Sequence, residues 1–436
     1  MLDRPAFPAV AQLMLEKLAV RDLTVGMHLH ELCGTWLEHP FWKTRFTLGA
    51  ADLVKLRQSG VTHCWIDRAK STVAQEAASP AVPAVPAVPV VPAELASEPA
   101  IAESAEEIAP PRPPQVALEE ELRHASAVLI KSREVVRSLF NEARMGRALD
   151  VESCLPLVND IAESVWRNQH AMLSLARLKT HDDYSYMHSV AVCALMVALA
   201  RQLGQSEAQA RSAGFAGLLH DIGKASMPLD LLNKPAALTE QEYAVIKTHP
   251  RRGHEMLSQT PGAAELELDV CLHHHERLDG KGYPEGLSGA GLSLAARMGA
   301  VCDVYDAVTS DRPYKAAWGP AESMAQMAQW AKSGQFDNSV FQAFVKSLGI
   351  YPVGSLVRLS SGRLGVVIEQ HAAALLKPVV KIFFSAISQM YVRPETLDLS
   401  RLGCNERVVE RESNRRWKFK HLEQMWAGDT LLQIGR

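Results

Sequence analysis

Residues 274–284 read His-His-Glu-Arg-Leu-Asp-Gly-Lys-Gly-Tyr-Pro, so two adjacent imidazoles lead directly into a loop rich in glycine and charge. Two further histidine-bearing motifs lie upstream, His-Asp-Ile-Gly-Lys at 220–224 and Thr-His-Pro at 248–250. An acidic motif, Cys-Asp-Val-Tyr-Asp, follows at 302–306. Imidazoles and carboxylates are the ligands that a hydrolytic metal centre uses. The sequence therefore predicts a chemistry based on bound metal.

Each of these residues has an ordinary interpretation when it is taken alone. A histidine on an apolar helix face, such as His188, is more often a buried core residue than a ligand. His249 before Pro250 would suit a helix end, and Lys224, one turn after Asp221, would suit a solvated lysine. Together the motifs favour a metal site, because bundle proteins build such sites between facing helices. A carboxylate next to a histidine can also bridge two cations.

The ligand types narrow the choice of metal. Neutral imidazoles and carboxylates suit divalent iron or manganese, which we favour, and also nickel, cobalt or zinc. The seven cysteines are scattered singly without a Cys-x-x-Cys pair, which argues against a structural zinc site and fits a reducing compartment. Two cations about 3.5–4 Å apart can activate water and hold the oxygens of a phosphoryl group.

The composition, with 47% apolar and 22% charged residues, is ordinary for a soluble globular protein. At 436 residues the chain is expected to form two or three domains. Its net charge of −3 argues against bulk binding to nucleic acid or to an anionic membrane. The longest apolar stretch, 189–200, is shorter than the about 20 residues that span a bilayer, and no signal-peptide pattern is present. We expect a cytoplasmic protein without a membrane anchor.

A proline-rich segment at 76–116 divides the sequence. Ala-Val-Pro repeats in it fix the backbone and remove hydrogen-bond donors, so an extended polyproline II spacer is predicted. Before it we expect a small α+β module at 1–75. After it we expect a helical domain at 117–350 and a β-rich extension with a charged tail at 351–436. The predicted fold class is mainly α.

Apolar spacing and capping residues give the finer elements. In the first module, strand patterns occur at 17–20, 28–32 and 63–66, and a helix pattern occurs at 52–58. Helices are expected at 117–146, 152–178 and 186–203, with N-caps at Ser206 and Thr239 for the helices that follow. Strands are expected at 353–359, 364–369 and 379–384.

Residues 120–350 resemble an HD-GYP domain, a branch of the HD phosphohydrolases. The resemblance covers about half of the chain and is carried by long motifs in the family's order. These motifs are Tyr-Met-His-Ser at 186–189, Leu-His-Asp-Ile-Gly-Lys at 219–224, His-Pro-Arg-Arg-Gly-His at 249–254, the run at 274–284, and Asp-Val-Tyr-Asp-Ala-Val-Thr-Ser-Asp-Arg-Pro-Tyr at 303–314. The first module, with Gly26-Met27 and Pro40-Phe41, resembles a domain of unknown function that often precedes HD-GYP domains.

This resemblance implies a substrate, cyclic di-GMP, and its hydrolysis to pGpG and, where a second cleavage follows, to GMP. It implies two divalent metal ions, with Asp221 bridging them. The family motif places the paired histidines directly before Glu-Arg, which selects His274 and His275 over His273. The implied metal ligands are His188, His220, Asp221, His249, His274, His275 and Asp303.

The resemblance also assigns substrate contacts. Lys224 is expected to meet the scissile phosphate, where it offsets negative charge in the transition state, so Asp221 and Lys224 are the implied catalytic residues. Arg312 and Lys315 match phosphate-contacting positions. For Tyr283, direct contact with a guanine and a scaffolding role in the loop are equally open. An ion pair between Arg277 and Asp279 that holds the loop is favoured over a catalytic role.

One position departs from the pattern of some family members. They carry a glutamate one helical turn before the first histidine, where it supports a third metal, and this chain has Tyr184 there. A phenol is a poor ligand for a hard divalent cation, so we expect a two-metal site. Cleavage of pGpG, if it needs a third metal, is thereby placed in doubt.

Two other functions remain open at this point. A cyclic di-GMP sensor or adaptor with little turnover would use the same pocket, but such proteins usually lose core ligands, and the set here is complete. A phosphohydrolase for another nucleotide is disfavoured by the intact Gly-Tyr-Pro run. Family members often work beside GGDEF or PilZ domain proteins, and the helix at 117–146 offers a surface for a homodimer.

Overall fold

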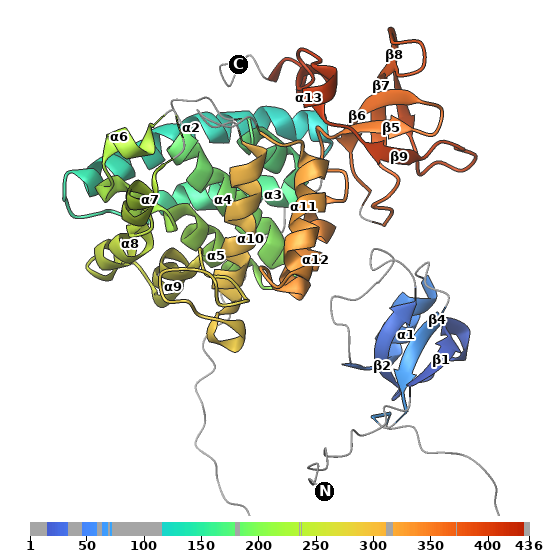
Figure 1. Cartoon of the computed structure of the whole chain (residues 1–436), viewed down its shortest axis with the longest axis horizontal. Helices are drawn as coiled ribbons and strands as arrows, with labels where there is room; N and C mark the ends of the chain where they lie inside the picture. The colour runs from blue at the N-terminus through green and yellow to red at the C-terminus, as the bar shows by residue number, and fades with distance from the viewer. Residues whose placement is uncertain are drawn as a thin grey trace, which may run out of the picture. The chain divides into compact units, whose positions relative to one another are not determined.

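The computed structural model describes residues 15–33, 46–58, 63–68, 70–71, 116–178, 184–234, 236, 238–310, 317–371 and 373–430. The chain forms two compact units, residues 1–111 and 112–436, which Figure 1 shows in blue and in the colours from cyan to red. The proline-rich segment predicted at 76–116 lies outside the described residues, apart from its last position. Its extended conformation, and the finer domain boundaries at 75, 116 and 350, stay predictions.

The N-terminal unit is a small antiparallel sheet with one helix. Its strands follow the order β1-β4-β2-β3, and Leu29 of β2 lies opposite Ile66 of β4. Both side chains are buried in a core that Leu56 of the helix completes. The α+β character expected for this module is therefore present. The bounds are β1 (Leu15–Ala19), β2 (His28–Cys33), β3 (Phe46–Thr47), α1 (Ala50–Gln58) and β4 (His63–Asp67).

The second unit is a helical bundle followed by a β-sheet. Helix α4 (Tyr184–Gln202) is buried along most of its length between its neighbours, which explains its continuous apolar sequence. Ser206 and Thr239 both close capping boxes at the starts of their helices, as predicted. The remaining helices are α2 (Leu118–Arg144), α3 (Leu155–Ala176), α5 (Glu207–Leu219), α6 (Leu229–Leu232), α7 (Glu240–Ile246), α8 (His249–Ser258), α9 (Glu265–His273), α10 (Leu294–Thr309), α11 (Pro320–Lys332) and α12 (Asn338–Leu348).

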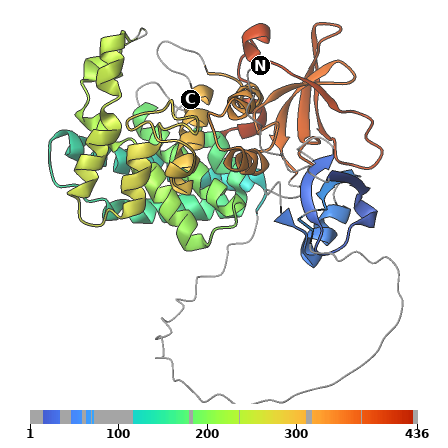
Figure 2. The same ribbon diagram turned by 60° about the horizontal axis from the view of Figure 1, so that its bottom comes forward.

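The C-terminal sheet lies beside the bundle in both views (Figures 1 and 2). Its strands follow the order β8-β7-β6-β5-β9 and pair antiparallel. The two edge strands, β8 and β9, were not predicted, because their side chains are largely exposed and lack an apolar alternation. The elements are β5 (Leu356–Leu359), β6 (Arg363–Glu369), β7 (Val379–Ser385), β8 (Met390–Asp398), β9 (Val408–Arg411), α13 (Asn414–Trp417) and α14 (Gln424–Ala427).

The predicted fold class is confirmed. The chain is mainly α, with a small α+β module at the N-terminus and a β-rich extension at the C-terminus. Among the described helices, none combines the length and the apolar character that crossing a bilayer requires.

A buried ion pair joins the first two helices of the bundle. The carboxylate of Glu121 in α2 is fully buried and accepts hydrogen bonds from Ser164 Oγ (2.6 Å) and Arg167 Nε (2.7 Å) in α3. Glu121→Ala would leave a guanidinium without its buried partner, so we expect the free energy of unfolding to fall by about 3–5 kcal/mol. Urea denaturation measures this loss.

The exposed neighbour Glu120 provides the matched control for Glu121. Glu120→Ala removes the same charge from the same first turn of α2 and should change the free energy of unfolding by about 0.5 kcal/mol or less. Equal losses in the two variants would contradict a specific contribution from the buried pair.

A carboxylate fixes one end of the C-terminal sheet. Burial alone would raise the pKa of Glu406, but hydrogen bonds from Ser361, Ser360 and Arg363 outweigh it and lower the pKa from 4.5 to about 2. The folded-state pKa is below the unfolded value, so this stabilisation is present above about pH 4.5. It is lost as the pH falls through about 2.

Glu406→Gln should therefore lower the melting temperature most near neutral pH, with the difference from the wild type shrinking as the pH falls toward 3. Melting curves of the two proteins recorded across this range test the expectation. A difference that stays constant with pH would show that the charge of Glu406 contributes nothing.

Candidate metal centre

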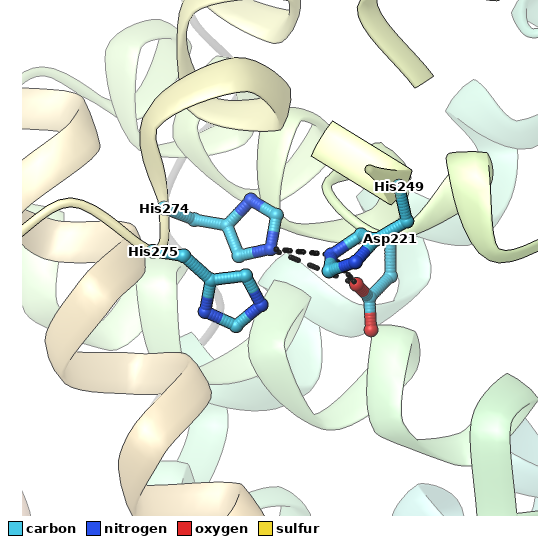
Figure 3. A group of neighbouring side chains, drawn as sticks. All are labelled: Asp221, His249, His274 and His275. Atoms are coloured by element: carbon cyan, nitrogen blue, oxygen red, sulfur yellow. Dashed lines mark hydrogen bonds and ion pairs between the residues drawn. The ribbon is translucent and has the colours of Figure 1, made fainter. Parts of the chain in front are cut away.

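The seven residues expected to bind metal come from five separate segments that meet inside the bundle. His188 lies in the first turns of α4, and Asp303 lies in α10. His220 and Asp221 follow the end of α5, and His249 begins α8. His274 and His275 follow the end of α9, where Figure 3 shows them facing His249 and Asp221. Six of the seven side chains are buried, and His275 is partly exposed.

Two glycines allow the backbone approaches that bring these segments together. A β-carbon at Gly223, two residues after Asp221, would lie 1.9 Å from the carbonyl oxygen of His249. A β-carbon at Gly217 in α5 would lie 3.1 Å from the carbonyl oxygen of Val192 in α4. A side chain at Gly223 would overlap the backbone of His249, and one at Gly217 would be crowded against α4. Glycine therefore allows both approaches, and each brings one histidine-bearing segment close to another.

Asp221 lies between two sets of ligand atoms. Its Oδ2 is 3.3 Å from His188 Nε2 and 3.5 Å from His220 Nε2. Its Oδ1 is 3.1 Å from His249 Nε2 and 3.6 Å from His274 Nε2. Each oxygen of one carboxylate therefore faces a different pair of imidazoles, which is the arrangement that a bridging ligand needs.

The ligand atoms fall into two compact groups. One consists of His188, His220 and Asp303, and the other of Asp221, His249, His274 and His275. In each group one nitrogen or oxygen atom per residue lies within 4.8 Å of all the others. His275 Nδ1 is also 3.5 Å from Asp303 Oδ2, which places the two groups side by side.

Hydrogen bonds made by Nδ1 of three histidines determine which ring nitrogen is free to bind metal. The Nδ1 atoms of His220, His249 and His274 lie 2.7–3.1 Å from backbone carbonyl oxygens. A carbonyl can only accept, so each Nδ1 carries the proton and donates it. In a neutral ring the Nε2 atom then presents a lone pair to the centre of the site.

These lone pairs point at one another. Nε2 of His249 lies 3.3 Å from Nε2 of His274, and both rings donate from Nδ1. A cation between the two Nε2 atoms would be bound by both and by the adjacent carboxylate of Asp221. The residues therefore fit a metal, and the donor set of imidazoles and carboxylates suits a divalent one.

Burial and neighbouring charges keep most of these side chains in the protonation state that binds metal. Burial lowers the pKa of His220 to about 3, and it also lowers the pKa values of His249 and His275. The pKa values of Asp221 and Asp303 are well below the ordinary value, because cationic and imidazole neighbours outweigh the effect of their burial. At neutral pH these imidazoles are neutral and the carboxylates are ionised, which are the ligating forms.

His188 differs because three carboxylates surround it. Burial alone would lower the pKa of His188, but hydrogen bonds with Asp221, Asp303 and Asp306 outweigh that effect and raise the pKa to about 10. His188 Nδ1 donates to Asp306 Oδ2 at 2.6 Å, while its Nε2 lies 3.0 Å from Asp303 Oδ1. In the metal-free protein His188 is therefore protonated, and metal binding must displace the proton from Nε2.

Asp306 was not predicted as a site residue, although the sequence carried a signal for it. It lies three residues after Asp303, and on a helix this spacing places both carboxylates on one face. A carboxylate that accepts from a ligating histidine orients the ring and makes it a stronger donor to the metal, and its loss typically weakens metal binding 10–100-fold.

We expect Asp306→Asn to weaken metal binding by about 10–100-fold, because the amide keeps an oxygen acceptor but loses the charge. Titration of metal-free protein with Mn²⁺ measures the affinity directly. Asp269→Asn is the matched control, because Asp269 receives the same kind of bond from His273 (2.8 Å), which belongs to neither group. Equal effects in the two variants would contradict a specific role for Asp306.

The glycine-rich loop closes over one side of the site. Glu276 is buried and its Oε1 accepts from the backbone N–H groups of Glu285 (2.6 Å) and Gly286 (2.9 Å), which fastens the far end of the loop. The predicted ion pair between Arg277 and Asp279 is confirmed, at 2.8 Å. Glu276 was missed, and its role could not be read from its spacing because it depends on the path of the loop.

The structure describes two of the four residues expected to contact substrate. The ammonium of Lys224 contacts Asp221 Oδ2 and is partly exposed. The ring of Tyr283 stacks on His275, with centroids 4.7 Å apart. Arg312 and Lys315 lie outside the described residues, as does the side chain of Tyr184. The assignments of individual ligands and contacts therefore stay predictions.

Comparison with known proteins matches the chain to two family models. The model of the HD domain family matches residues 156–340, and that of a domain of unknown function, DUF3391, matches residues 15–154. A Pseudomonas aeruginosa protein named cyclic di-GMP phosphodiesterase PA4108 is 51% identical over 417 residues, covering 95% of this chain and 96% of the relative. The Xanthomonas campestris response regulator RpfG, also named a cyclic di-GMP phosphodiesterase, is 37% identical over 232 residues, covering 52% of this chain and 58% of the relative.

A third relative has a different named substrate. The Vibrio cholerae protein named 3′3′-cGAMP-specific phosphodiesterase 1 is 35% identical over 177 residues, which is 41% of each chain. Among solved structures, Bd1817, an HDG"Y"P protein from Bdellovibrio bacteriovorus, aligns with a TM-score of 0.42 and 15% identity over 76% of this chain and 98% of that chain.

The helical bundle, its two groups of imidazoles and carboxylates that could hold metal, and the relatives together define the class of this protein as a metal-dependent hydrolase. The chain belongs to the HD domain family, in its HD-GYP branch, and carries the DUF3391 module at its N-terminus.

Proposed function

We propose that this protein hydrolyses cyclic di-GMP to pGpG with two divalent metal ions. His188, His220 and Asp303 would hold one ion, and His249, His274 and His275 the other, with Asp221 shared between them. The observation that carries this proposal is that each oxygen of Asp221 faces a different pair of Nε2 atoms, at 3.1–3.6 Å.

The choice of substrate rests on relatives. The protein that matches nearly the whole chain at 51% identity is named a cyclic di-GMP phosphodiesterase, and so is RpfG. The sequence also retains the complete His-His-Glu-Arg and Gly-Tyr-Pro run of the branch. Other relatives are named for 3′3′-cGAMP, so the activity is best tested against several cyclic dinucleotides.

The metal ions, when bound, would lower the pKa of water to supply hydroxide near neutral pH and would neutralise charge on the phosphate. The protein contributes orientation and further positive charge. Lys224 contacts Asp221 Oδ2 and is partly exposed, so its ammonium can reach a phosphate placed beside that carboxylate. The buried histidines keep their rings fixed through their Nδ1 bonds, which holds the ligands ready before substrate arrives.

The metal identity follows from ligand type and supply, and we favour iron or manganese over nickel, cobalt or zinc. We also infer a cytoplasmic location from the unpaired cysteines, and a homodimer through the helix that begins near residue 117. GGDEF or PilZ domain proteins are the partners we would test first.

The decisive experiment combines elemental analysis with a product assay. Protein purified without oxygen is analysed for metal, incubated with cyclic di-GMP, 3′3′-cGAMP or cyclic di-AMP, and the products are separated by chromatography. We expect cyclic di-GMP to be consumed fastest, with pGpG as the product. Accumulation of GMP would show a second cleavage, and tight binding without any product would instead identify a sensor.

A further inference from the structure

A lysine and two tyrosines form a cluster next to the metal site. Lys247 follows the end of α7, and its Nζ lies 4.9 Å from the ring centroid of Tyr243 and 5.1 Å from that of Tyr283. Tyr283 in turn stacks on His275, with centroids 4.7 Å apart. A continuous series of contacts therefore leads from a metal-site histidine outward to α7.

The cation in this cluster has no acidic partner. Lys247 is half-buried and forms no ion pair with any residue that the structure describes. For comparison, Lys234, which precedes α7 in the chain, is paired with Glu242 of that helix at 2.6 Å. An ammonium has three donors, and aromatic faces satisfy its charge only in part. Lys247 is therefore available to a ligand that offers acceptor atoms.

The aromatic surface beside this cation is exposed. Tyr243 has 46% of its surface accessible, although it is a large apolar side chain. Tyr283 is more enclosed, and burial together with Tyr243 raises its pKa. The ring of Tyr283 is already stacked on His275, so Tyr243 is the ring of this cluster that a ligand could stack on.

We propose that Tyr243 and Lys247 form a guanine-binding subsite at the edge of the metal centre. The base would stack on Tyr243, and the ammonium of Lys247 would donate to the O6 and N7 acceptors of guanine. This inference rests on the proposed function, which places the phosphate of the same nucleotide at the metals.

The chemistry of Lys247 distinguishes guanine from adenine. Guanine presents two acceptors on this edge, whereas adenine presents N7 and an amino donor at N6. Lysine can only donate, so the amino group of adenine would face a cation without forming a bond. A phosphate could also pair with Lys247, but it would make no use of the exposed ring beside the cation.

Binding of mononucleotides tests the subsite without requiring turnover. The metal-loaded full chain is titrated calorimetrically with 5′-GMP and with 5′-AMP, which share ribose and phosphate, so their difference reports the base. We expect GMP to bind about tenfold more tightly than AMP, which is the discrimination of one good contact to a base edge. Lys247→Met should abolish this preference by weakening GMP more than AMP, because guanine offers the ammonium two acceptors on this edge and adenine offers one. Tyr243→Leu should weaken both nucleotides.

Two further variants complete the design. Lys131→Met, which removes an exposed lysine paired with Asp160 at 2.7 Å on helices α2 and α3, should leave both affinities unchanged. Lys247→Gln repeats the test if the methionine variant does not fold. Its amide can accept as well as donate, so the variant should bind GMP and AMP with similar affinity.

The outcomes separate the subsite from the activity. Equal binding of GMP and AMP by the wild type, or a preference that survives in Lys247→Met, would overturn the subsite even if cyclic di-GMP is hydrolysed. Equal weakening of both nucleotides by Lys247→Met would also overturn it, because the ammonium would then contact phosphate. A preference that depends on Lys247 in a protein without turnover would uphold the subsite and refute the hydrolase.

Discussion

Asp221→Ala is expected to abolish hydrolysis of cyclic di-GMP and to remove most of the bound metal. One carboxylate oxygen faces His188 and His220, and the other faces His249 and His274. In the variant both sets of residues lose the carboxylate that they share, and the negative charge that would offset repulsion between two cations is also lost. Elemental analysis and the chromatographic product assay measure the two effects on the same sample.

The control for this experiment is Asp160→Ala, which removes a partly exposed carboxylate that pairs with Lys131 at 2.7 Å and belongs to neither group of candidate ligands. It should retain full metal content and full turnover. Circular dichroism of Asp221→Ala shows whether the helices persist. Wild-type turnover by a folded Asp221→Ala protein would refute the metal centre as the site of chemistry.

Lys224→Met is expected to lower kcat by about 100–1,000-fold while the metal content stays near that of the wild type. The ammonium contacts Asp221 but has part of its surface exposed, and it belongs to neither group of ligand atoms. Removal of one group that stabilises transition-state charge typically has an effect of this size. Steady-state kinetics and elemental analysis separate it from a loss of metal.

Lys224→Arg gives a conservative comparison, because it keeps the charge but changes the shape of the donor. It should recover part of the lost kcat. If Lys224→Met instead lost its metal as Asp221→Ala does, the lysine would serve to hold the bridging carboxylate and would have no direct role toward substrate.

The helices were predictable wherever local signals agreed. Residues 117–146 were expected to be helical and form α2 (Leu118–Arg144), and Gly146 follows it with a positive φ of 65°. The helix expected at 152–178 is interrupted at Asn168, whose extended backbone the apolar spacing did not reveal. The side chain of Asn168 accepts from the N–H of His170 and donates to the carbonyl of Val116. This break therefore depends on a contact 52 residues away along the chain.

The seven expected ligands could be named because the motifs that carry them match the HD-GYP pattern in residue type and order. The structure brings all seven close together, while His273 is hydrogen-bonded to Asp269. Glu276 was missed because its hydrogen bonds from the N–H groups of Glu285 and Gly286 depend on the path of the loop. Asp306 was missed although its spacing from Asp303 places both carboxylates on one helix face, because its partner His188 lies 118 residues away along the chain.

The sequence by itself determined the mainly α class and the first helices of the bundle, with the caps at Ser206 and Thr239, because these depend on residue types and on spacing along a few turns. Tertiary structure alone decided that the two oxygens of Asp221 face different partners and that Lys247 lies against Tyr283. These features arise where segments separated by dozens of residues pack against one another. The acceptor or ring that each side chain meets there is set by the path of the whole chain.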